Sequence, residues 1–144
     1  MMKQKNQMRM IFDAQEENVG IARITSSSFA SQLDFTLAEL EEIKVAVSEA
    51  VSNAVIHAYP KRDGQVELVM AAFDSCVSYE VRDYGVGIAD IDKAREPDFS
   101  SQSERMGMGF VFMESFMDSV TVESKVDQGT VVRMVKSCTP MTVQ

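Results

Sequence analysis

The sequence predicts an α+β fold, a two-layer sandwich in which helices cover one face of a mixed, mostly antiparallel sheet. Three observations carry this prediction. One long segment, residues 36–58, has apolar side chains at helical spacing. Two pairs of segments with strand-like composition, 65–72 with 77–82 and 119–124 with 130–136, are each joined by a short turn. The resulting order of helices and strands is typical of a sandwich with helices grouped on one face.

The beginning of the chain is predicted to form a strand and a helix. Residues 8–12 have the composition of a short strand, and residues 16–32 place apolar side chains at loose helical spacing. Three serines at positions 26–28 weaken the helix prediction, because a serine hydroxyl competes for backbone hydrogen bonds. Residues 33–35 then link this segment to the next helix.

The helix over residues 36–58 is the clearest element of the sequence. Thr36 and Glu39 have the spacing of a capping box at its start, and Pro60 follows its end. The apolar side chains of this helix fall on one face, which is expected to pack against the core. The apolar stripe on that face consists of Leu40, Ile43, Val47, Ala50, Val51 and Ala54.

The C-terminal half is predicted to contain a loop and one more helix between the two strand pairs. Residues 90–95 can form one or two helical turns. Residues 96–105 are polar, lack periodicity and contain proline, so we predict a mobile loop there. A helix over residues 109–117 leads into the last hairpin, and the tail after residue 138 is expected to be frayed.

Composition limits the class of protein. With 144 residues, of which 45% are hydrophobic, the chain is predicted to form one domain, residues 1–144, with a substantial core. No apolar run approaches the roughly eighteen residues that read as a membrane span. The first six residues lack the apolar stretch of a signal peptide, so we expect a cytoplasmic protein.

Charge and cysteine content argue against two further classes. The net charge of −8 disfavours direct binding to nucleic acid or to an anionic membrane, because phosphate contacts require a basic patch. Cys76 and Cys138 are the only cysteines, neither belongs to a CxxC motif, and the chain has one histidine. A structural zinc site is therefore not expected, and both thiols are interpreted as inert.

Three short motifs have the side chains that a magnesium–nucleotide site requires. Glu49 and Asn53 lie four residues apart, and so on one face of the long helix. The sequence Asp-Tyr-Gly-Val-Gly follows at residues 83–87, and Gly107 and Gly109 come after the predicted loop. Glycines let the backbone approach phosphate, an amide oxygen can hold a hard cation, and a carboxylate can accept a proton.

With Gly129–Thr130 before the last strand, these motifs occur in the same order as in the Bergerat-fold (GHKL) ATPases, which the sequence resembles over residues 49–130. That superfamily includes gyrase-type ATPases, histidine kinases and anti-sigma serine kinases. The stretches 48–54 and 107–129 are most similar to the anti-sigma-factor serine kinases, in particular those of sporulation. The resemblance implies a Bergerat ATP-binding fold, ATP or ADP with Mg²⁺ as ligands, and a homodimer.

The resemblance also implies roles for individual residues. Glu49 would act as the catalytic base that activates the serine hydroxyl of a protein substrate, and Asn53 would bind magnesium through its side-chain oxygen. Asp83 would accept a hydrogen bond from the adenine amino group. Gly85 and Gly87 would lie where the chain bends against the nucleotide.

The remaining implied contacts are with the phosphates and the base. Gly107 and Gly109 precede the last predicted helix, where free N–H groups can face phosphate. Arg105 would reach the terminal phosphate, and residues 97–105 would act as a lid that closes more with ATP than with ADP. Thr130 would lie near adenine.

Each assignment has a simpler alternative. Glu49 could be a solvated helix glutamate, Asn53 a surface amide and Asp83 the cap of a strand end, while Arg105 could equally be a solvated loop arginine. Their order in the sequence favours the functional interpretation for the first three. His57 continues the face of Glu49 and Asn53, but a lone histidine of this kind is expected to be packed or solvated.

Taken together, the resemblance implies an ATP-dependent anti-sigma factor that sequesters a sigma-F-like sigma factor and phosphorylates a serine of a small anti-anti-sigma protein. A general-stress anti-sigma serine kinase is the nearest alternative. A nucleotide-gated binding module without kinase activity is another, against which the presence of Glu49 argues. A histidine-kinase fragment is disfavoured because no phosphoacceptor segment precedes the domain and the single histidine lies in the site helix.

Overall fold

The computed structural model describes residues 3–96 and 102–138, with only the backbone of residues 102–105. Within these residues, five strands form one sheet in which every pairing is antiparallel. Across the sheet the strands are β1 (Asn6–Asp13), β2 (Gln65–Ala72), β3 (Cys76–Asp83), β5 (Gly129–Ser137) and β4 (Ser119–Lys125).

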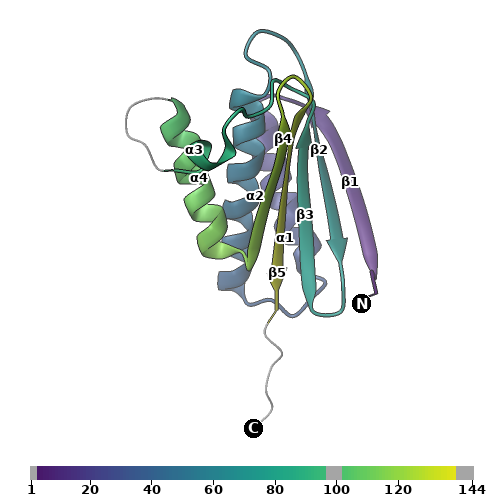
Figure 1. Ribbon diagram of the computed structural model, residues 1–144. Coiled ribbons are helices and arrows are strands. Elements are labelled where there is room, and N and C mark those ends of the chain that lie inside the picture. Colours follow the sequence, from purple (N-terminus) through teal and green to yellow (C-terminus); the bar gives the residue numbers. More distant parts are fainter. Residues whose placement is uncertain (1–2, 97–101, 139–144) are drawn as a thin grey trace.

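The helices gather on one face of this sheet (Figure 1). They are α1 (Glu17–Ala30), α2 (Leu37–His57), the single turn α3 (Ile91–Ala94) and α4 (Gln102–Phe116). Helix α2 lies between α1 and α4 and contacts β2, β3 and β5. The predicted two-layer α+β sandwich is therefore confirmed. In the described part of the chain, no helix combines the length and apolar character needed to cross a lipid bilayer.

The predicted capping box fixes the start of α2. The Thr36 hydroxyl accepts a hydrogen bond from Glu39 N at 3.1 Å, and the Glu39 carboxylate accepts one from Thr36 N at 2.8 Å. The helix buries one stripe of side chains in the core: Ile43, Ala46, Val47, Ala50, Val51 and Ala54. Burial of this stripe fixes how α2 is rotated against the sheet. A different face of the helix therefore carries Glu49, Asn53 and His57.

Helix α4 corrects two expectations. It begins at Gln102 rather than near residue 109, so residues 102–105 are helical and do not belong to a loop. Gly107 and Gly109 lie inside the helix instead of in a turn before it. The physical reason is burial: Phe110 is in the core and Met106 packs against it, which outweighs the low helix propensity of glycine. Residues 97–101 of the predicted loop and lid lie outside the described residues.

A buried lysine anchors the other end of α4. Lys136 on β5 is 7% exposed, and its ammonium group donates a hydrogen bond to Phe116 O at 2.5 Å. The Glu42 carboxylate on α2 lies 3.7 Å away. A cation at a helix C-terminus satisfies a carbonyl that has no partner within the helix. Lys136 therefore ties the last turn of α4 and the middle of the sheet to α2.

Candidate nucleotide-binding site

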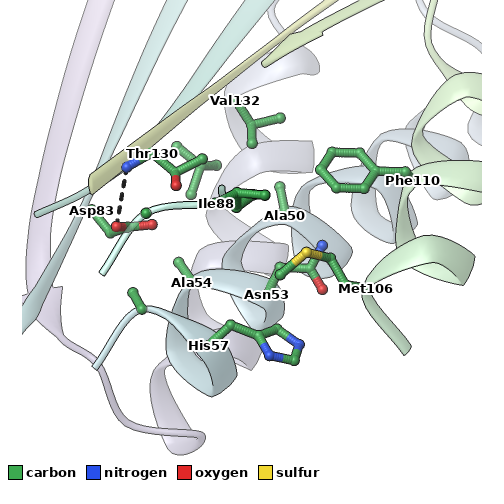
Figure 2. Close-up of a pocket in the computed structure, with 13 residues that line it drawn as sticks. Ala50, Asn53, Ala54, His57, Asp83, Ile88, Met106, Phe110, Thr130 and Val132 are labelled. Carbon is green, nitrogen blue, oxygen red and sulfur yellow. Dashed lines mark hydrogen bonds between the residues drawn. The ribbon is translucent and has the colours of Figure 1, made fainter. Parts of the chain in front are cut away.

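A pocket lies between α2, α4 and the ends of β3 and β5 (Figure 2). Most of its wall is apolar, from residues such as Ile88, Met106 and Phe110. The polar side chains in the wall are those of Asn53, His57, Asp83 and Thr130. A concave, mostly apolar surface with a few converging polar groups is typical of small-molecule sites.

Asp83 joins two of the sequence motifs at one end of the pocket. Its carboxylate is buried, and Oδ1 accepts hydrogen bonds from Gly85 N at 3.0 Å and from Thr130 N at 3.2 Å (Figure 2 draws the second). Burial raises the pKa of the Asp83 carboxyl, and the two backbone N–H groups act in the opposite direction without cancelling it. A further N–H donor from a ligand would therefore stabilise the ionised carboxylate.

The glycines after Asp83 allow close packing of backbone on backbone. A Cβ atom at Gly85 would lie 2.1 Å from Ala58 O, at the end of α2. Gly87 has a φ of 73°, a left-handed conformation that favours glycine, and its own Cβ would lie 2.2 Å from Lys125 O. Gly87 lines the pocket, whereas Gly85 acts through the packing of this loop on α2. Their contact with a nucleotide stays a prediction.

At the α2–α4 side of the site, three predicted residues come together. A Cβ atom at Gly109 would lie 3.0 Å from Glu49 Oε2 and 3.3 Å from Asn53 Nδ2. Asn53 Nδ2 is buried and has no hydrogen-bond partner among the described residues. Such a group is normally satisfied, and an amide can turn to present either its oxygen or its nitrogen. The residues present thus fit a polar ligand, including a cation bound through the amide oxygen.

The described residues do not test the predicted phosphate contacts of Arg105, Gly107 and Gly109, but they change the position expected for the two glycines. The N–H groups without a partner inside a helix are those of the N-cap and of the first three helical residues. In the described part of α4 they therefore belong to residues 102–104 rather than to Gly107 or Gly109. The expected position of the two glycines before the helix is therefore wrong, and their contact with phosphate stays a prediction. The Arg105 side chain lies outside the described part of the structure, so its role also stays a prediction.

Sequence reasoning missed several residues of the pocket wall. Ile88 is the first residue after the Asp-x-Gly-x-Gly motif, and neither Met106 nor Phe110 has a predicted role in the site. His57 lines the pocket and is half-buried, in agreement with a packed histidine. The spacing of Met106 and Phe110 could have indicated a helix that starts before Gly109, because residues four apart share one helical face.

Comparison with known proteins agrees with this geometry. Residues 12–136 match the family model of the histidine kinase-like ATPase domain. The chain belongs to this family. Within this ATPase domain, Asp83, Thr130 and Asn53 line one pocket, and Glu49 and Asn53 lie side by side next to Gly109.

Similar proteins match over nearly the whole chain. An anti-sigma F factor of Geobacillus thermodenitrificans is 50% identical over 135 residues, which cover 92% of each chain. An anti-sigma F factor of Bacillus subtilis is 45% identical over 135 residues, with the same coverage of 92%. The solved RsbU and RsbW domains of a Mycobacterium tuberculosis protein match with a TM-score of 0.66 and 18% identity. That match covers 92% of this chain and 32% of the other, and it shows a shared fold.

The Gly109→Ala variant should bind ATP about tenfold more weakly or worse while keeping its fold. The added methyl group would require the ends of the Glu49 and Asn53 side chains to shift by a few tenths of an ångström, away from the positions proposed for the reacting groups and magnesium. Alanine favours a helix over glycine by up to about 1 kcal/mol, so α4 itself should not weaken. Calorimetric titration with ATP, together with a thermal melt, measures both effects.

Gly20→Ala is the matched control for this variant. Gly20 also lies in a helix, but a Cβ atom there would have nothing within 4 Å. Its ATP affinity should equal that of the wild type. Wild-type affinity in Gly109→Ala as well would show that the nucleotide does not use this part of the pocket.

Proposed function

We propose that the chain is an ATP-dependent anti-sigma factor that is also a protein-serine kinase. The observation that supports this most directly is the convergence of Glu49, Asn53 and Gly109 beside a pocket that contains Asp83 and Thr130. The match to anti-sigma F factors over 92% of the chain supports a sigma-F-like partner rather than a general-stress one. We also propose a cytoplasmic homodimer whose substrate is a small anti-anti-sigma protein.

The site suggests where each part of ATP would bind. Adenine would lie at the Asp83–Thr130 end, because a carboxylate acceptor suits its amino group. The phosphates would lie toward Asn53 and the start of α4, where helix N–H groups and a cation can stabilise negative charge. When bound, ATP would supply the phosphoryl group, and Mg²⁺ would neutralise charge on the phosphates.

Within this arrangement, each residue has a defined task. Glu49 would accept the proton of the attacking serine hydroxyl at its carboxylate. Asn53 would hold magnesium through its amide oxygen, with water and phosphate oxygens as the other ligands. Gly109 would leave room for the reacting groups between α2 and α4, since any side chain there would meet Glu49 and Asn53.

A transfer assay tests the proposal. The purified chain is incubated with radiolabelled ATP, Mg²⁺ and an anti-anti-sigma protein encoded in the same organism, and the label on that protein is followed. A partner in which the accepting serine is replaced by alanine should remain unlabelled. Binding of a sigma factor and of ATP without any transfer would instead identify a nucleotide-gated binding module that lacks kinase activity.

Asp83→Ala should weaken ATP and ADP binding by the same factor, because adenine is common to both. The loss should be about 1–3 kcal/mol, the usual effect of leaving a buried donor without its partner. Calorimetric titration with each nucleotide measures it. Asp74→Ala, in the exposed turn between β2 and β3, is the control and should bind both normally. Unchanged ATP and ADP affinity in Asp83→Ala would show that Asp83 does not contact the base.

A further inference from the structure

We propose that Ser124 is a positioning residue that fixes the direction in which the Thr130 hydroxyl donates its proton. Ser124 thereby favours an amino-purine over an oxo-purine in this pocket. The inference rests on the proposed binding of a purine nucleotide. Ser124 lies on β4, within the stretch 107–129 that carries the resemblance, but outside the four motifs of the nucleotide site and without a predicted role.

The first step is the sheet register, which brings Ser124 to Thr130. The two residues are direct partners in the antiparallel pairing of β4 and β5, and their hydroxyl oxygens lie 2.8 Å apart. Ser124 Oγ also accepts a hydrogen bond from Ile88 N at 2.7 Å and donates one to Gly129 O at 3.1 Å. The Ser124 side chain thus contacts the loop after Asp83, at Ile88, and both residues of the Gly129–Thr130 motif.

The second step is to count protons. A hydroxyl group has one proton to donate and two lone pairs that accept. Only one arrangement makes all three contacts at once: Ser124 donates to Gly129 O, and its lone pairs accept from Ile88 N–H and from the Thr130 hydroxyl. In this arrangement, which we infer because it leaves none of the three contacts unmade, the proton of Thr130 is directed at Ser124. Toward the pocket, which it lines, Thr130 Oγ1 offers only lone pairs.

The third step combines this result with Asp83. The Asp83 carboxylate, which accepts a hydrogen bond from Thr130 N, lies at the same end of the pocket as Thr130 (Figure 2). Two acceptors close together suit an exocyclic amino group, which carries two N–H donors. A carbonyl oxygen at the same position of the base would face two acceptors and find no donor. Ser124 thus acts through Thr130 and need not touch the ligand.

The experiment compares ADP with inosine diphosphate, in which a carbonyl replaces the amino group of adenine. Ser124→Ala frees the Thr130 proton, so Thr130 can donate toward the base. ADP affinity should fall about fivefold to tenfold, while inosine diphosphate should bind as well as or better than before. The preference for ADP should therefore fall about fivefold or more. Ser124→Thr keeps the hydroxyl and should retain the wild-type preference.

Two controls separate this role from general damage to the fold. Ser119→Ala, an exposed position on the same strand, should leave both affinities unchanged. In a Thr130→Val background, Ser124→Ala should not change the preference further, because its effect passes through the Thr130 hydroxyl. This double-mutant comparison remains decisive even if Ser124→Ala lowers the melting temperature.

The possible results divide clearly. An equal loss of both nucleotides in Ser124→Ala, or an unchanged preference, would overturn the role of Ser124. If the wild type binds ADP in those cases, the proposed nucleotide site still stands. A wild type that binds neither nucleotide would overturn both the site and the inference that rests on it.

Discussion

The Glu49→Gln variant should bind ATP and ADP as the wild type does and transfer phosphate on the order of a hundredfold more slowly or worse. Glutamine has the shape of glutamate and can keep the position of Glu49 beside Gly109, but its neutral amide cannot accept a proton. Binding and chemistry should therefore separate in this variant. Nucleotide titration and the initial rate of label transfer, measured in parallel, test this.

Glu41→Gln is the matched control for this experiment. Glu41 lies on the same helix, two turns earlier, and its side chain is 61% exposed beside Lys44. This variant should transfer phosphate at the wild-type rate. A wild-type rate in Glu49→Gln would show that Glu49 is not the catalytic base. A loss of nucleotide binding in that variant would instead show that Glu49 helps to bind the nucleotide before any transfer.

Gly85→Ala should lower the free energy of unfolding by about 3 kcal/mol or more. The added Cβ atom would lie 2.1 Å from Ala58 O and 2.5 Å from its carbonyl carbon, so backbone rather than a flexible side chain would have to move. The movement would also break the hydrogen bond from Val86 N to Ala58 O, now 2.9 Å long. Nucleotide binding should be lost together with stability, because Asp83 accepts from Gly85 N.

Urea unfolding of the wild type, Gly85→Ala and Gly20→Ala measures this effect. Gly20→Ala should be neutral or stabilising by up to about 1 kcal/mol, since its methyl group meets no other atom and alanine favours the helix. The same unfolding midpoint for Gly85→Ala and the wild type would show that the loop can move away from α2 without loss.

Much of this fold could be predicted because local and tertiary preferences agree. The capping box at Thr36 and the turn at Asp74–Ser75 act within a few residues, so they can be identified without knowledge of the fold. The proximity of Glu49 and Asn53 follows from helix geometry alone. The resemblance implies only that Asp83 and Thr130 each lie near adenine. The hydrogen bond from Thr130 N to Asp83, across 47 positions, was not predicted and comes from the structure.

The errors arise where tertiary packing decides against local preference. Gly107 and Gly109 indicate a turn by propensity, but the burial of Phe110 and the packing of Met106 extend the helix through them. Ser124 could not be identified for a different reason. Its importance depends on the register of β4 against β5, and a shift by one residue would turn its hydroxyl to the opposite face of the sheet.

The position of β5 has a consequence for the protein while it is being synthesised. This strand follows all the others in the described chain, yet it lies between β3 and β4. Until it leaves the ribosome, β3 has an open edge, β4 lacks the strand beside it, and the last turn of α4 lacks Lys136. Asp83 also lacks one of its two backbone donors. A nascent or prematurely terminated chain should therefore be open to proteases and unable to hold a nucleotide.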